Sequence, residues 1–234
     1  MKSLNQKDFL KKYSLLENTK VSEIIEEKLK YFRFGLNQNV RISTFGIYDF
    51  LEEFFKKNKF MSSHYISRKY ESLIDSFPIN SDLYELIEND RLKEPSNSVD
   101  YFLLSIDFEL AYSKKYLVEE IWRILKVNGY LFILDLNKFH FTNYIKQSPF
   151  HKIAKIKTNI KLNWFQELGF ELESKDQINI CEDFEKSRLT FILTKFAFFY
   201  FPFIHLFIFK KKLKPNLKGF LNTNISRTHL LETQ

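Results

Sequence analysis

Residues 98–137 read SVDYFLLSIDFELAYSKKYLVEEIWRILKVNGYLFILDLN, and they carry the strongest fold signal in the chain. Val99–Ile106 is an almost unbroken apolar run, typical of a strand buried on both faces of a parallel sheet. Residues 114–126 place apolar side chains on one face at helical spacing. The pair Asn128–Gly129 is predicted to stop this helix, with Gly129 in the left-handed conformation, before a second buried strand at Tyr130–Leu136. These elements form a right-handed βαβ unit, so the sequence predicts an α/β protein.

The length and cysteine content indicate one domain in a reducing compartment. A chain of 234 residues can bury a core that needs no disulfide or metal. Its single cysteine, Cys181, excludes an internal disulfide. Residues 1–30 are polar and charged, without the apolar run of a secretory signal. We therefore expect a cytoplasmic protein.

The net charge of +7 raises the question of nucleic-acid binding. The bias toward Lys, Asn, Ile, Phe and Tyr, with only five Gly and five Pro, is more typical of an A- and T-rich genome. Residues 139–161 are aromatic and then basic, a composition that can stack bases and contact phosphates. They contain no arginine and no recognised binding motif. Nucleic acid is therefore not the expected partner.

Several of these residues together resemble class I S-adenosylmethionine-dependent methyltransferases. The resemblance lies in Ser98–Val99–Asp100, in Glu109, in EEIWRILKVNGYLFILDLN at 119–137, and in WFQELGFE at 164–171. It covers roughly residues 20–215. It points to a small bacterial branch, similar to type 11 methyltransferases, that has a degenerate glycine-rich loop.

The resemblance implies a Rossmann-like doubly wound α/β sheet, mostly parallel with an antiparallel last strand. It also implies a single methyltransferase-like domain over residues 1–215, with N-terminal lid helices in 1–34. Residues 216–234 are expected to form a flexible tail. Within 1–34, a helical stripe of apolar residues begins at Val21, and a plain packing helix explains that stripe equally well.

The segment after the predicted first strand, Val40–Ser43, is expected to contact the cofactor S-adenosylmethionine. Such sites use glycines, because backbone N–H groups must approach the ligand closely. By the resemblance, Ser43 stands where the family has its first glycine, and Gly46 is the remaining one. Phe45 must turn away for the cofactor to enter. A helix is predicted over Ile47–Lys59.

The second strand, predicted at His64–Ser67, departs from the family pattern. An acidic residue normally follows it, because a carboxylate accepts hydrogen bonds from both ribose hydroxyls. Here Arg68 and Lys69 follow instead. Residues 85–98 are polar and interrupted by proline, and we predict a surface loop.

The resemblance assigns further cofactor contacts. Asp82–Leu83 matches the acid–apolar step before the central strand, where the acid accepts a hydrogen bond from the adenine amino group. Ser105 and Glu109 follow the central strand, at the edge where open α/β sheets bind ligands. The structural alternatives are a turn residue for Asp82 and a helix-start carboxylate for Glu109. The predicted cofactor-binding residues are Ser43, Gly46, Asp82, Leu83, Ser105 and Glu109.

No catalytic base and no metal site can be assigned from the sequence. Ile106 stands where the family motif has a histidine. The five histidines are scattered, without zinc spacing. Of these, His205 is expected to be packed in the core.

The run Leu189–Phe209 is long and apolar enough to suggest a membrane span. Lys195 lies within it and Pro202 interrupts it, so we predict instead a helix through Tyr200 and a last strand at Phe203–Phe209. The phenylalanines and the basic residues that follow leave weak peripheral membrane contact through 189–218 as an alternative.

The sequence supports two functions from different classes. The first is methyl transfer from S-adenosylmethionine to a small-molecule or lipid-like acceptor. The second is a non-catalytic methyltransferase-like protein, with a binding or scaffold role, that has lost the cofactor. The eroded glycine loop and the missing acid after the second strand favour the second.

Overall fold

Seven strands form one mixed sheet in the computed structural model, in the order β3-β2-β1-β4-β5-β7-β6. The structure describes residues 19–32, 39–46, 48, 51–68, 83–105, 108, 111–136, 158–178 and 204–212. Strands β1 to β5 are parallel to one another, and β7 runs antiparallel to both β5 and β6. The strands are β1 (Arg41–Phe45), β2 (Met61–Ser67), β3 (Tyr84–Ile87), β4 (Val99–Leu104), β5 (Leu125–Leu136), β6 (Phe170–Ile178) and β7 (Ile204–Lys211). The predicted mostly parallel sheet with an antiparallel last strand is confirmed.

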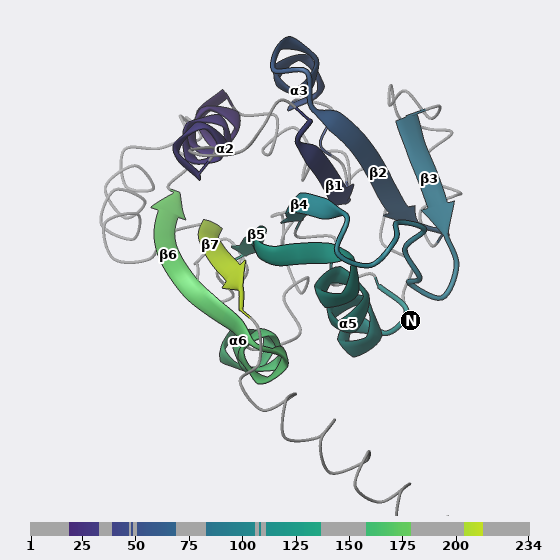
Figure 1. Cartoon of the computed structure of the whole chain (residues 1–234). Helices are drawn as coiled ribbons and strands as arrows, with labels where there is room; N and C mark the ends of the chain where they lie inside the picture. Colours follow the sequence, from purple (N-terminus) through teal and green to yellow (C-terminus); the bar gives the residue numbers. More distant parts are fainter. Residues whose placement is uncertain are drawn as a thin grey trace, which may run out of the picture.

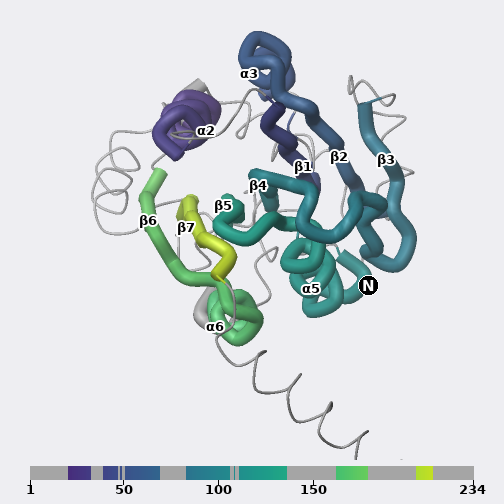
Figure 2. Tube along the Cα trace, in the orientation of Figure 1, coloured from purple at the N-terminus to yellow at the C-terminus, as the bar shows by residue number. Residues whose placement is uncertain are grey.

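Helices cover both faces of the sheet, as Figure 1 shows. One face carries α2 (Thr19–Phe32) and α3 (Glu52–Lys57), and the other carries α5 (Lys114–Ile124) and α6 (Thr158–Leu168). In α2 the side chains of Val21, Ile25 and Leu29 are buried, because residues four apart share one helix face. The chain trace in Figure 2 shows β1 and β4 side by side in the middle of the sheet. This three-layer arrangement buries both faces of the central strands.

The core on the α5 and α6 side is rich in aromatic rings. The ring of Phe165 lies 5.6 Å from Phe209 and 5.9 Å from Phe170, between centroids. Phe207 and Phe209 alternate with Leu206 and Ile208, and all four are buried. The apolar residues at the end of the 189–209 run therefore belong to a two-sided core strand.

The structure describes only part of the segment 189–218, for which the sequence suggested a membrane span or peripheral membrane contact. Residues 204–212 are described, whereas 189–203 and 213–218 lie outside it. No helix among the described residues is long and apolar enough to cross a membrane. The predicted tail, 216–234, also lies outside the described residues.

The connection from α5 to β5 differs from the prediction. The helix ends at Ile124, and Leu125 is already extended, with φ −64° and ψ 136°. The left-handed residue is Asn128, with φ 66°, and Gly129 does not have a positive φ. A Cβ on Gly129 would meet the carbonyl oxygens of Asp100 and Lys126, each at 2.9 Å. Position 129 therefore requires glycine because a side chain would clash with two backbone carbonyl oxygens. The left-handed conformation of the turn is adopted by Asn128.

This connection forms an irregularity between β4 and β5. Val99 pairs with Leu125 and Tyr101 with Tyr130, so β5 advances five positions while β4 advances two. The carboxylate of Asp100 accepts a hydrogen bond from Lys126 Nζ at 2.7 Å and another from the backbone N–H of Arg41 at 2.9 Å. Asp100 therefore joins the irregular segment to the start of β1.

Candidate functional site

The carboxyl ends of β1 and β4 lie side by side. The N–H of Ser105 donates to the Phe45 carbonyl at 3.0 Å, and the N–H of Gly46 donates to the Tyr65 carbonyl of β2 at 2.9 Å. Gly46 has φ 105°, a conformation that glycine adopts without the strain of a side chain. Two of the predicted site residues, Gly46 and Ser105, are thus neighbours at the edge where parallel α/β sheets bind ligands.

The side chain of Phe45 leaves this edge free. It is fully buried in the core on the α5 and α6 side, in one cluster with Phe102 and Leu117. Strand alternation explains this direction, because Phe45 and Ser43 point to the same face of β1. Phe45 therefore turns away from the place where the resemblance puts the cofactor.

Ser43 lies inside the sheet, and its hydroxyl has an internal partner. It donates to Glu94 Oε1 at 2.6 Å, while the Tyr65 hydroxyl donates to Glu94 Oε2 at 2.5 Å. Burial, together with the Glu94 carboxylate, raises the pKa of Tyr65. Glu94 was missed by the sequence analysis, since it lies 51 positions from Ser43 in a segment predicted as surface loop.

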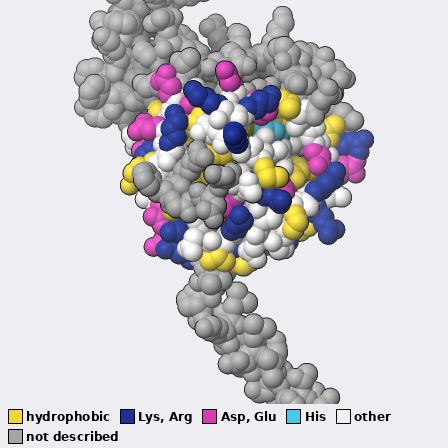
Figure 3. All heavy atoms as spheres, turned by 45° about the horizontal axis from the view of Figure 1, so that its top comes forward, with side chains coloured by type: hydrophobic (Ala, Val, Ile, Leu, Met, Phe, Trp, Pro, Cys, Tyr) yellow, Lys and Arg dark blue, Asp and Glu magenta, His cyan; other side chains and the backbone are white. Residues whose placement is uncertain are grey.

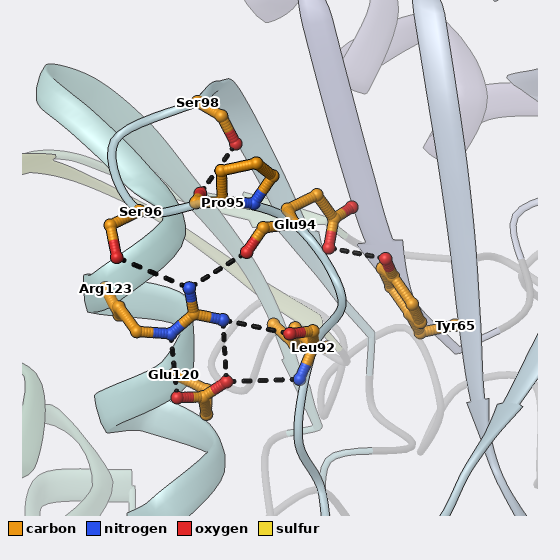
Figure 4. Close-up of polar contacts among 8 residues, drawn as sticks. All are labelled: Tyr65, Leu92, Glu94, Pro95, Ser96, Ser98, Glu120 and Arg123. Carbon is orange, nitrogen blue, oxygen red and sulfur yellow. Dashed lines mark hydrogen bonds and ion pairs between the residues drawn. The ribbon is translucent and has the colours of Figure 1, made fainter.

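An arginine fork holds the segment that carries Glu94 against α5 (Figure 4). Arg123 donates to the carbonyl oxygens of Leu92 and Glu94, each at 2.9 Å, and to both carboxylate oxygens of Glu120 at 2.9 Å. Glu120 also accepts from the N–H of Leu92 at 3.2 Å. Burial alone would raise the pKa of Glu120, but its hydrogen bond to Arg123 lowers it.

Of the predicted acid–apolar step, the structure describes only Leu83. Leu83 immediately precedes β3, and Asp82 lies outside the described residues. The ligand edge follows Ile87, where the turn residues Asn89 and Asp90 have φ 59° and 56°. The segment 85–98, predicted as one loop, therefore contains most of β3 and the turn after it.

The acids that follow β3 already have partners in the structure. Glu88 forms an ion pair with Arg68, the residue after β2, and both side chains are about half exposed. Asp90 is fully buried and accepts a hydrogen bond from the N–H of Ser113 at the start of α5. Glu88 thus places a carboxylate beside the residue that follows β2, where it is paired with Arg68.

A buried polar array supports the segment between β1 and α3. The Nδ1 atom of His64 lies 2.9 Å from Thr44 Oγ1, and its Nε2 lies 3.2 Å from Glu52 Oε2. Beside this array, the N–H of Tyr48 donates to the Tyr84 hydroxyl at 3.2 Å. Burial lowers the pKa of His64, and Glu52 opposes this effect.

A groove of about 810 Å³ borders β3, residues 91–95 and one face of α5. Its lining includes Glu85, Tyr116 and Arg123, but neither Gly46 nor Ser105. Glu85 is paired with Lys93 at 2.6 Å. The groove therefore reaches Glu88 at the end of β3 and Glu94, but it does not extend to Gly46 or Ser105.

The β1–β4 edge has one feature that the resemblance implies for a site of S-adenosylmethionine. Gly46 gives space for close backbone approach, and the cofactor carries no phosphate, so a phosphate-type loop is not needed. Glu109, predicted to contact the cofactor, lies outside the described residues.

The described residues contain no group of three or more potential metal ligands. On the face in Figure 3, basic and acidic side chains are interspersed, without one continuous basic patch among the coloured residues.

Comparison with solved structures defines the fold. A Haloferax volcanii chain, described as a methyltransferase and solved with a methyltransferase activator, is 14% identical and gives a TM-score of 0.59; the match covers 85% of this chain and 92% of the other. A SAM-dependent methyltransferase from Archaeoglobus fulgidus gives 0.57 at 16% identity, covering 85% and 99%. A Galdieria sulphuraria protein, described as a sarcosine dimethylglycine methyltransferase, gives 0.51 at 13% identity, covering 82% and 85%.

The chain therefore has the fold of class I S-adenosylmethionine-dependent methyltransferases, as the sequence resemblance implied. No model of a known protein family matches the sequence, and no curated protein matches it.

Proposed function

We propose that this protein transfers a methyl group from S-adenosylmethionine to a small-molecule or lipid-like acceptor in the cytoplasm. The observation that carries the proposal is the pairing of Gly46 and Ser105 at the carboxyl edge, with Phe45 packed in the core. Together with the fold, this edge supports cofactor binding.

The residues proposed to hold the cofactor come from three strand ends. Gly46 supplies close backbone approach after β1, and Ser105 and Glu109 follow β4. Glu88 replaces Asp82 in this proposal, because Glu88 follows β3 at the ligand edge. The carboxylate of Glu88 can accept hydrogen bonds from ribose hydroxyls or an adenine amino group after it releases Arg68.

The chemistry requires little of the protein beyond positioning. The bound cofactor supplies an electrophilic methyl group on a positively charged sulfur. The protein must hold the acceptor in line with that methyl group and keep water out, an effect that contributes several kcal/mol. The buried strands β4 and β5 provide a rigid base for such alignment.

The test is isothermal titration of the full chain with S-adenosylmethionine and with S-adenosylhomocysteine. We expect both to bind in the micromolar range. Glu88→Gln should weaken both ligands by about 5- to 150-fold if its carboxylate accepts their hydrogen bonds. The control is Glu119→Gln, which changes an exposed carboxylate on α5 and should leave both affinities unchanged.

The second candidate function is a methyltransferase-like scaffold without a cofactor. It is favoured by Arg68, a cation at the position where the family has its ribose-binding acid. A stable, folded chain that gives no heat with either ligand at millimolar concentration would establish this alternative and exclude methyl transfer.

A further inference from the structure

A row of polar side chains crosses three strands at the same carboxyl edge. Asp135 of β5 pairs directly with His205 of β7, and His205 pairs directly with Gln177 of β6. Directly opposed residues in antiparallel strands share one face, with Cβ atoms about 5 Å apart. Asp135 is buried, His205 is half-buried and Gln177 is exposed, so the row runs from the core to the surface.

The row lies at the level of the proposed cofactor edge. Leu104 pairs with Ile133, so Asp135 comes one position beyond the level of Ser105. Two strand spacings separate β4 from β7, which places His205 roughly 10 Å along the sheet from Ser105. His205 therefore lies at the same edge of the sheet as the proposed cofactor site.

The environment of His205 combines apolar packing with two opposite charges. Its ring centroid lies 5.7 Å from that of Phe207, and its Nδ1 is enclosed, with no hydrogen-bond partner in the part of the chain that the structure describes. The charged groups that act on it are Asp135 from β5 and Lys175 from β6. Burial and Lys175 lower the pKa of His205, and Asp135 opposes them. The imidazole is thus neutral at pH 7 and has a carboxylate beside it to stabilise a gained proton.

We propose that His205 is the general base of the methyl transfer, with Asp135 as its positioning residue, and that the acceptor is a protic O–H or N–H group. The inference rests on the proposed function. As the acceptor heteroatom bonds to the methyl carbon, its proton passes to the imidazole, which becomes an imidazolium beside Asp135. The electron pair of the broken sulfur–carbon bond stays on sulfur. Acceptors that are nucleophilic without losing a proton would not need this dyad.

The test is NMR titration of the histidine Cε1–H resonances, with His205 assigned by its loss in His205→Gln. The pKa of His205 is measured in the full chain saturated with S-adenosylhomocysteine and then with S-adenosylmethionine. A unit positive charge within about 8 Å lowers a histidine pKa by roughly half a unit or more. We expect that lowering with the positively charged sulfonium and not with the neutral thioether.

The outcomes separate this inference from the function on which it rests. If both ligands bind and the pKa of His205 is the same with each, His205 is not at the reacting end and the inference is overturned. If neither ligand binds, the proposed function fails as well. Asp135→Asn should lower the pKa of His205 in the free protein, because it removes the stabilising carboxylate. The matched control Gln177→Leu should leave it within about 0.2 units, and an equal shift in both variants would contradict the role of Asp135.

Activity gives a second readout once a hydroxyl or amine acceptor is turned over. His205→Gln should lower kcat by at least about 100-fold while the Kd for S-adenosylhomocysteine changes less than twofold. The wild-type rate should fall as His205 is protonated at low pH, and this dependence should disappear in the variant. An unchanged kcat in His205→Gln would overturn the proposal.

Discussion

Thr44 Oγ1 and His64 Nδ1 lie 2.9 Å apart between the neighbouring strands β1 and β2, and Gly46 follows Thr44 by two residues in the chain. On the other side of the ring, Nε2 lies 3.2 Å from Glu52 Oε2 at the start of α3. The Thr44 hydroxyl can donate to Nδ1 of the neutral ring, whereas Nε2 and Glu52 Oε2 are close but have no hydrogen-bond partner among the described residues. The imidazole thereby connects the sheet to the helix that follows the proposed cofactor loop.

We expect this imidazole to make stability fall on acidification. Burial lowers the pKa of His64 in the folded protein, so below about pH 6.5 the unfolded chain binds a proton that the folded chain does not. Stability is therefore lost as the pH falls from about 6.5 toward the lowered pKa. Urea denaturation of wild type and His64→Gln between pH 5 and 8 measures the contribution of His64 to the unfolding free energy. The difference in unfolding free energy between the two should shrink at low pH, and a constant difference would contradict it.

Lys211 should produce a dependence of the same sign on the alkaline side, with stability rising as the pH rises. Its ammonium is buried, donates to the carbonyl oxygens of Trp122 and Leu125 at 2.6 Å each, and lies 4.1 Å from the Trp122 ring centroid. Burial lowers its pKa to about 8, so between about pH 8 and 10.5 the unfolded chain binds the extra proton. Across that window the unfolding free energy of the wild type should rise by roughly 1–3 kcal/mol more than that of Lys211→Met. Identical pH profiles for the two proteins would disprove this.

Gly129 should tolerate no side chain. A Cβ there would lie 2.9 Å from two backbone carbonyl oxygens, and backbone cannot move aside cheaply. Gly129→Val should lower the unfolding free energy by more than about 1 kcal/mol, measured by denaturant titration. Asn128→Gly should be nearly neutral, because Asn128 already holds the left-handed conformation. The account is wrong if the costs of the two substitutions are reversed.

Arg123→Lys should loosen the segment after β3 although it keeps the charge. A lysine cannot reproduce the fork that reaches Leu92, Glu94 and Glu120 together. We expect a loss of about 1–3 kcal/mol and faster amide exchange at Leu92, whose N–H donates to Glu120. Unchanged stability and exchange would show that the fork contributes little.

The fold was predictable because its signals are local. The apolar runs of β4 and β5 and the helical spacing of α5 stand next to one another in the sequence. The short strand β3 was missed because Tyr84–Ile87 contains a glutamate and is followed by polar residues. The resemblance placed the acid–apolar step at Asp82–Leu83, directly before this strand in the sequence.

The site was less predictable because its contacts are not local. Glu94 reaches Ser43 across 51 positions, and His205 meets Asp135 only through the pairing of β5 with β7. Nothing in the spacing of these residues indicates that they meet. The sequence predicted only core packing for His205, and the neighbouring carboxylate became apparent from the register of β5 with β7.

The most direct test compares two glycines of similar conformation at opposite edges of the sheet. Gly46 has φ 105° and Gly169, between α6 and β6, has φ 98°. Gly46→Ala and Gly169→Ala should both cost stability, because both place a side chain in the left-handed region. Isothermal titration with S-adenosylhomocysteine at a temperature where both variants are folded should show wild-type affinity for Gly169→Ala and at least about tenfold weaker binding for Gly46→Ala. Equal affinities in the two variants, or no binding by the wild type, would contradict a cofactor site at the Gly46–Ser105 edge.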